Sequence, residues 1–105
     1  MLQSAINIVN ENINNPDFSV AGLSSSLFMH RTSLYKKLLY ITGKTPLEFI
    51  RAMRLKRAAQ LLETDGVYVS EVAYMVGFNS PKVFASHFKE EFGCSPTEYR
   101  RSKKI

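Results

Sequence analysis

The chain has 105 residues, of which 45% are apolar, and a formal net charge of +5. This length allows one compact unit with a modest core and is small for an enzyme with a deep pocket. No run of eighteen apolar residues occurs, which argues against a membrane span, and the single cysteine excludes an intrachain disulfide and fits a reducing cytosol. The surplus of 14 basic over 9 acidic residues is one part, though a weak one, of the composition typical of nucleic-acid-binding domains.

The periodicity of the chain predicts helices throughout, because apolar residues recur at steps of three and four and no window alternates like a strand. In chain order, the predicted helices span residues 2–13, 20–27, 31–42, 45–63, 70–76, 81–92 and a short stretch from Pro96. Residues that favour turns separate them, for example Pro16 after the first helix and Gly66 after the fourth. The predicted fold class is therefore all-α.

Helical spacing also predicts which side chains are buried. For the helix at 31–42 they are Leu34, Leu38 and Ile41, and for the helix at 81–92 they are Phe84 and Phe88. For the longest helix they are Leu47, Ile50, Ala58, Leu61 and Leu62. Three tyrosines are predicted to pack with a wet hydroxyl, namely Tyr40, Tyr68 and Tyr74.

A nine-residue motif occurs twice, fifty residues apart. Residues 43–51 and 93–101 share Gly, a hydroxyl residue, Pro, Glu, an aromatic residue and Arg at the same spacing. The Gly predicts the end of one helix, and the hydroxyl residue with Pro and Glu predicts a capping box that begins the next. A repeat of this period indicates one supersecondary unit used twice. We predict two such units, residues 1–44 and 65–105, joined by a linking helix at 45–64.

Each unit contains a short helix, a tight turn and a longer helix, which together make a helix-turn-helix. The spacing between equivalent apolar residues predicts that the second turn is one residue longer than the first. Gly77 can take a left-handed conformation at the second turn, whereas Phe28, in the equivalent position, disfavours it. The first turn is therefore predicted to differ in shape.

The longer helix of each unit is predicted to expose a polar face. With the apolar residues turned inward, the outward residues are Thr32, Tyr35, Lys36 and Leu39 in the first unit and Lys82, Ala85, Ser86 and Lys89 in the second. Lys, Tyr, Thr and Ser can donate hydrogen bonds to phosphates or base edges. A single stripe of this kind is commonly just a solvated helix face, but two matched basic stripes favour nucleic-acid binding.

The tract 70–78, followed by Phe84, Phe88, Gly93 and Pro96, resembles the DNA-binding domain of the AraC/XylS transcription regulators over nearly the whole chain. Residues 29–38 resemble the version at the C-terminus of hybrid two-component sensor-regulators of gut bacteria. The resemblance implies sequence-specific binding of double-stranded DNA, with recognition helices at 31–42 and 81–92 in successive major grooves.

The resemblance also implies roles for individual residues. Base edges would be read by Arg31, Thr32, Tyr35 and Lys36 in the first unit and by Pro81, Lys82, Ala85 and Ser86 in the second, while Lys89 would hold a phosphate. Pro81 and Ala85 offer only apolar contact, so the second helix is expected to supply less hydrogen-bonded specificity. Two departures from the family are His30 in place of Ser before the first recognition helix and Leu39 in place of a basic residue. Because the two helices differ, we expect a non-palindromic site that needs no dimer.

The second hypothesis is a helical protein-interaction module that contacts RNA polymerase, and the basic outward faces argue against this as a sole role. The sequence gives no support to an enzyme, because His30, His87 and Cys94 show no metal-ligand or nucleophile spacing. No cofactor or metal is expected. The basic run at 54–57 is expected to be solvated rather than bound to phosphate.

We further expect the chain to be part of a longer cytoplasmic regulator with sensing or phosphorelay domains, which could be anchored to a membrane elsewhere. No membrane contact by this segment is expected.

Overall fold

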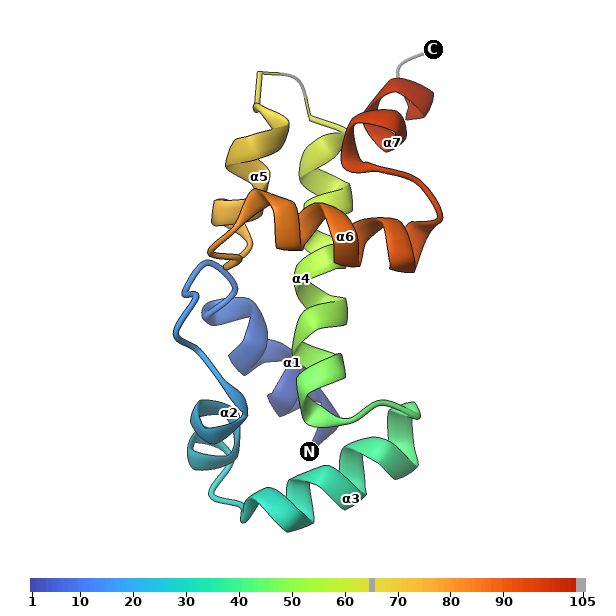
Figure 1. Cartoon of the computed structure of the whole chain (residues 1–105). Helices are drawn as coiled ribbons and strands as arrows, with labels where there is room; N and C mark the ends of the chain where they lie inside the picture. The colour runs from blue at the N-terminus through green and yellow to red at the C-terminus, as the bar shows by residue number, and fades with distance from the viewer. Residues whose placement is uncertain (65, 104–105) are drawn as a thin grey trace.

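The computed structural model describes residues 1–64 and 66–103, and every regular element in these two ranges is an α-helix (Figure 1). In chain order the helices are α1 (Leu2–Glu11), α2 (Val20–Ser26), α3 (Arg31–Thr42), α4 (Pro46–Leu62), α5 (Val69–Met75), α6 (Pro81–Phe92) and α7 (Pro96–Lys103). The predicted all-α fold with seven helices is confirmed. Across the same ranges the helices are too short or too polar to serve as a membrane span.

The repeated motif forms the same local structure in both places. The Thr45 N–H donates to Glu48 Oε1 at 2.9 Å while the Glu48 N–H donates to Thr45 Oγ1 at 3.2 Å. Ser95 and Glu98 make the equivalent pair, both at 3.1 Å. These reciprocal bonds satisfy N–H groups at the starts of α4 and α7, which confirms both predicted capping boxes.

The motif glycines end the preceding helices. Gly43 and Gly93 have φ of 75° and 79°, so the chain leaves α3 and α6 through a left-handed residue. Other boundaries differ from the prediction by one or two residues, since α1 ends at Glu11, α2 ends at Ser26, α4 spans Pro46–Leu62 and α5 spans Val69–Met75.

Two hydrophobic clusters lie along α4. The first is formed by α1, α2 and α3 against the first half of α4, and the second by α5 and α6 against its second half. Phe84 and Phe88 are the largest side chains in the second cluster, and their burial stabilises it by about 1.5–3 kcal/mol each. We refer below to α1–α3 as the first unit and α5–α7 as the second unit. The exact division of the chain at residues 44 and 64 stays a prediction.

Several burial predictions were wrong. Ile41 is 49% exposed in the last turn of α3, and Leu47 is 63% exposed in the first turn of α4. On α4 the predicted burial of Ile50, Ala58 and Leu62 is confirmed, and the buried face also includes Phe49, Leu55 and Ala59. The tyrosines predicted to pack are largely in solvent, with exposed fractions of 92% for Tyr40, 72% for Tyr68 and 54% for Tyr74.

The two helix-turn-helix turns have the same backbone shape, which overturns the predicted difference. Phe28 has a φ of 55° and Gly77 a φ of 90°. In each unit the next N–H donates to the carbonyl five residues back at 2.9 Å, from Met29 to Ser24 and from Phe78 to Ala73. The predicted difference in length is confirmed, because four residues separate α2 from α3 and five separate α5 from α6.

Candidate nucleic-acid interface

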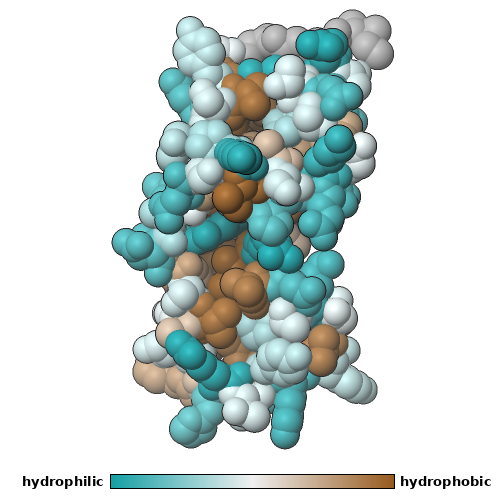
Figure 2. Space-filling model, viewed as in Figure 1, coloured by the Kyte–Doolittle hydropathy of each residue, from teal (hydrophilic) through white to brown (hydrophobic). Residues whose placement is uncertain are grey.

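The longer helices of the two units are roughly parallel in the view of Figure 1, where α6 crosses α4 and α3 lies below the start of α4. The helix α3 ends beside the start of α4, and α6 packs against the second half of α4 in the second hydrophobic cluster. In the same view, Figure 2 shows apolar side chains along the middle of the face that is turned towards the viewer, and hydrophilic side chains on both sides of them.

The outward face of α3 carries the four residues predicted from the first unit. Arg31, Thr32, Tyr35 and Lys36 are all exposed, whereas Leu34 and Leu38 on the opposite face are fully buried. The helix also carries Lys37, so it has three basic residues and no acidic one. Its surface is therefore suited to an anionic partner.

The outward face of α6 is less basic. Lys82, Ser86 and Lys89 are exposed, while Pro81 and Ala85 are partly buried. Glu90 and Glu91 follow in the last turn, so two basic residues are balanced by two acidic ones. Phe84 and Phe88 hold the opposite face in the core. The structure thus brings the predicted residues together within each helix, on two faces of unlike charge.

The N-terminus of each helix is also different. At α6 the Ser80 Oγ accepts a hydrogen bond from the Val83 N–H at 3.3 Å. At α3 the equivalent residue is His30, which makes no side-chain cap bond within the described part of the chain. The first-turn N–H groups of α3 are therefore open to solvent or to a phosphate oxygen.

Arg54 is the residue that the sequence analysis missed. Its guanidinium is half-buried and joins three backbone carbonyls, with Nη2 donating to Asn15 O at 2.8 Å and Phe18 O at 3.3 Å, and Nη1 to Gly77 O at 3.3 Å. Burial lowers the pKa of Arg54, but an arginine remains charged at neutral pH. A signal was present in the sequence, because Ile50 and Ala58 lie one turn before and after Arg54 and are both buried.

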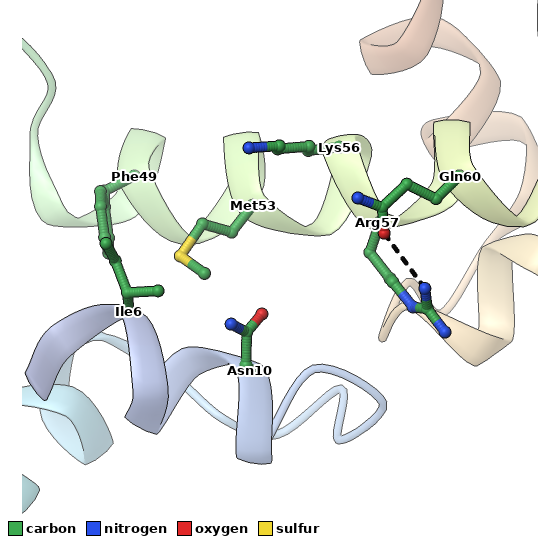
Figure 3. Close-up of a pocket in the computed structure, with 7 residues that line it drawn as sticks. All are labelled: Ile6, Asn10, Phe49, Met53, Lys56, Arg57 and Gln60. Atoms are coloured by element: carbon green, nitrogen blue, oxygen red, sulfur yellow. Dashed lines mark hydrogen bonds between the residues drawn. The ribbon is translucent and has the colours of Figure 1, made fainter. Parts of the chain in front are cut away.

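The rest of the basic run behaves as predicted. Lys56 and Arg57 are exposed, and the Arg57 Nη1 donates to Gln60 Oε1, on the same helix, at 3.1 Å. Both side chains border a groove between α1 and α4 (Figure 3). The apolar floor of this groove is Ile6, Phe49 and Met53, and none of the predicted site residues lines it.

A family model described as a helix-turn-helix domain matches residues 23–102, which include both turns and the whole of α3, α4 and α6. The chain belongs to the AraC-type helix-turn-helix family. The domains of this family are the DNA-binding parts of transcription regulators.

Two curated relatives show the setting of AraC-type domains in longer proteins. The chain is 44% identical over 100 residues to histidine kinase P4 of Formosa agariphila, a match covering 95% of this chain and 7% of the kinase. It is 36% identical over 83 residues to the RCS-specific HTH-type transcriptional activator RclR of Escherichia coli, covering 79% of this chain and 29% of RclR. The chain thus spans less than a third of either relative.

Solved AraC-type structures have the same arrangement of helices. The DNA-binding domain of AdpA, determined in complex with a target DNA, superposes with a TM-score of 0.87 at 32% identity and covers 96% of this chain and 90% of its own. The C-terminal domain of the response regulator AraT from Geobacillus stearothermophilus gives 0.89 at 23% identity, with 98% and 85% covered. At that lower identity the likeness concerns the fold.

Proposed function

We propose that this domain binds double-stranded DNA sequence-specifically, with α3 and α6 in successive major grooves on one side of the duplex. The observation that carries the proposal is the pairing of two helix-turn-helix units whose recognition helices each bury an apolar face and expose a polar one. The second helix of a helix-turn-helix is the element that enters the major groove.

The size of the molecule supports contact with two grooves. Successive turns of the major groove are about 34 Å apart. The molecule is 44 Å long in its largest dimension, and α4, with 17 residues and a length of about 26 Å, links the two units that carry the recognition helices. One copy can therefore reach both grooves without a dimer.

The two helices would read DNA differently. In α3, Arg31, Thr32, Tyr35 and Lys36 supply donors for base edges, and the absence of acidic residues from this helix favours phosphate contact. In α6, Lys82 and Ser86 are the hydrogen-bonding readers, Pro81 and Ala85 offer apolar contact to a thymine methyl, and Lys89 holds a phosphate. The first helix would thus supply most of the electrostatic affinity.

The relatives suggest the larger protein in which the domain acts. The match to part of a histidine kinase supports a hybrid sensor-regulator with sensing and phosphorelay domains, acting on DNA in the cytoplasm. A protein contact, with RNA polymerase as the expected partner, is a second function that the domain would combine with DNA binding. Phe28 and Tyr40, which are 98% and 92% exposed, are the aromatic residues that such a contact would use.

Lysine substitutions test the DNA-binding proposal. On duplexes selected by the chain from random-sequence DNA, Lys36→Ala is expected to weaken binding about tenfold and Lys82→Ala by less, measured by fluorescence anisotropy at fixed salt. Both lysines are exposed, so the unfolding temperature should stay nearly unchanged.

Lys56→Ala is the matched control, because Lys56 is an exposed lysine that borders the α1–α4 groove. It should leave affinity unchanged. If Lys36→Ala and Lys82→Ala also bind as tightly as the unaltered chain, α3 and α6 are not the readers.

A further inference from the structure

The two recognition helices belong to units with separate hydrophobic clusters, so their relative orientation needs its own determinant. Apolar packing against α4 is non-directional and by itself allows small rotations of one unit against the other. Hydrogen bonds to a planar guanidinium are directional and resist such rotations.

We infer that Arg54 is a positioning residue that fixes the orientation of α3 relative to α6 and so sets the half-site spacing that the domain accepts. This inference rests on the proposed DNA-binding function. Arg54 would touch no DNA itself, because both of its terminal nitrogens donate to backbone carbonyls inside the protein.

Two of the three carbonyls belong to the first unit and one belongs to the second. Asn15 and Phe18 lie in the loop between α1 and α2, in the first unit. Gly77 lies in the turn between α5 and α6, in the second unit, four residues before α6 begins. A rotation of one unit against the other would therefore break at least one bond to the same guanidinium.

The backbone at Gly77 shows how closely the units approach at this point. A Cβ atom at Gly77 would lie 2.5 Å from the carbonyl oxygen of Ile13 and 2.9 Å from Arg54 Cζ. The turn of the second unit is thus seated directly on the loop of the first, with the guanidinium beside it. Arg54 Nε is buried there and has no hydrogen-bond partner among the described residues. The hydrogen bonds from Arg54 to the two units are therefore made by its two terminal nitrogens.

Distances between spin labels test the inference without DNA. Nitroxides at Lys37→Cys on α3 and Glu90→Cys on α6, in a Cys94→Ser background, report the separation of the recognition helices by double electron–electron resonance. Both labelled positions are exposed. We expect one narrow distance distribution with Arg54 present and a broader one in Arg54→Met, with helical content retained by circular dichroism.

Arg57→Met is the matched control, because among the described residues the Arg57 guanidinium bonds only to Gln60, within α4. It should leave the distribution narrow. If Arg54→Met does not fold, Arg54→Lys is measured, since lysine keeps the charge and stem but cannot span three carbonyls. A distribution as narrow as that of the unaltered chain in a folded Arg54 variant would overturn the inference.

Binding to DNA gives a second readout. On the selected duplex, Arg54→Met is expected to bind roughly tenfold more weakly, because the helices are no longer preorganised. It should also discriminate less than the unaltered chain against duplexes whose half-sites are moved apart by one base pair. An equal loss on every spacing would contradict the inference. If the unaltered chain selects no DNA, the proposed function fails, and the label distances still decide whether Arg54 orients the helices.

Discussion

The turns of the two helix-turn-helix units have one backbone conformation in two opposite environments. Phe28 takes its positive φ with 98% of the residue exposed, whereas Gly77 takes it in a buried position against Ile13 and Arg54. A residue other than glycine can adopt this conformation at a cost of about 1–2 kcal/mol, provided that its side chain has room. The comparison shows that φ alone does not require glycine here, and that the close approach of the two units does.

The recognition helices differ in a parallel way. The helix α3 has three basic residues, no acidic residue and no side-chain cap, while α6 has two of each charge and a Ser80 cap. The shared features, namely the glycine ends and the capping boxes, lie in the scaffold. The fold is therefore repeated, and the DNA-facing surface is not.

The largest effect is expected for Gly77→Ala. The new Cβ would meet a backbone oxygen at 2.5 Å in addition to the cost of positive φ, so the free energy of unfolding should fall by about 3 kcal/mol or more. Chemical denaturation followed by circular dichroism measures this. Gly93→Ala is the control, since Gly93 has positive φ but open space around it and should lose only about 1–2 kcal/mol. Equal losses at the two glycines would show that the units do not press together at Gly77.

The caps of the recognition helices give the next effect. Ser80→Ala removes the acceptor for the Val83 N–H and should lower the free energy of unfolding by about 1 kcal/mol. The equivalent change in the first unit, His30→Ala, should have almost no effect, because His30 makes no cap bond. A comparable loss from His30→Ala, measured by the same denaturation, would mean that α3 has a cap in solution.

A smaller effect of opposite sign is expected for Phe28→Gly. Glycine relieves the strain of positive φ but loses more backbone entropy on folding, so the net gain in stability should be about 0.5 kcal/mol. The nearly complete exposure of Phe28 means that little packing is lost. Thermal unfolding measures the gain. A lower unfolding temperature in Phe28→Gly would show that the phenyl ring makes a stabilising contact.

The capping boxes are the feature in which the two units should behave alike. The hydrogen bond from the Thr45 backbone lowers the pKa of Glu48, and the one from Ser95 lowers the pKa of Glu98, from the ordinary value of 4.5. A carboxyl whose pKa is lowered on folding stabilises the protein above its unfolded pKa, and this contribution is lost as the pH falls through the folded pKa. Glutamine has no carboxyl group to protonate. In Glu48→Gln and in Glu98→Gln, the free energy of unfolding should therefore fall less than in the unaltered chain as the pH is lowered through the pKa of the folded state. If the free energy of unfolding depends on pH in both variants as it does in the unaltered chain, the ionised carboxyls of the capping boxes do not stabilise the fold.

Local signals in the sequence predicted the helices, the capping boxes and the extra residue in the second turn, because Pro, Gly, Thr and Ser act on their own neighbours. Features that depend on distant segments were missed. Periodicity places Ile41 on the apolar face of α3, but only the structure shows that it is 49% exposed. The role of Arg54 depends on carbonyls that lie 23 to 39 residues away along the chain.

The positions of the candidate DNA readers on exposed helix faces followed from helical geometry, since the two core residues of each recognition helix fix which side faces out. The positive φ of Phe28 did not follow, because propensity argues against it. The hydrogen bonding of the turn offsets that preference, since the 2.9 Å bond from the Met29 N–H to the Ser24 carbonyl is the one that Phe78 and Ala73 make in the second unit.

Selection of duplexes from random-sequence DNA by this chain tests the central claim most directly. The account predicts a non-palindromic consensus with two blocks centred about ten base pairs apart, bound by one copy of the chain, and with the stronger preference in the block contacted by α3. A palindromic consensus bound by two copies, or no enrichment of any sequence, would contradict it.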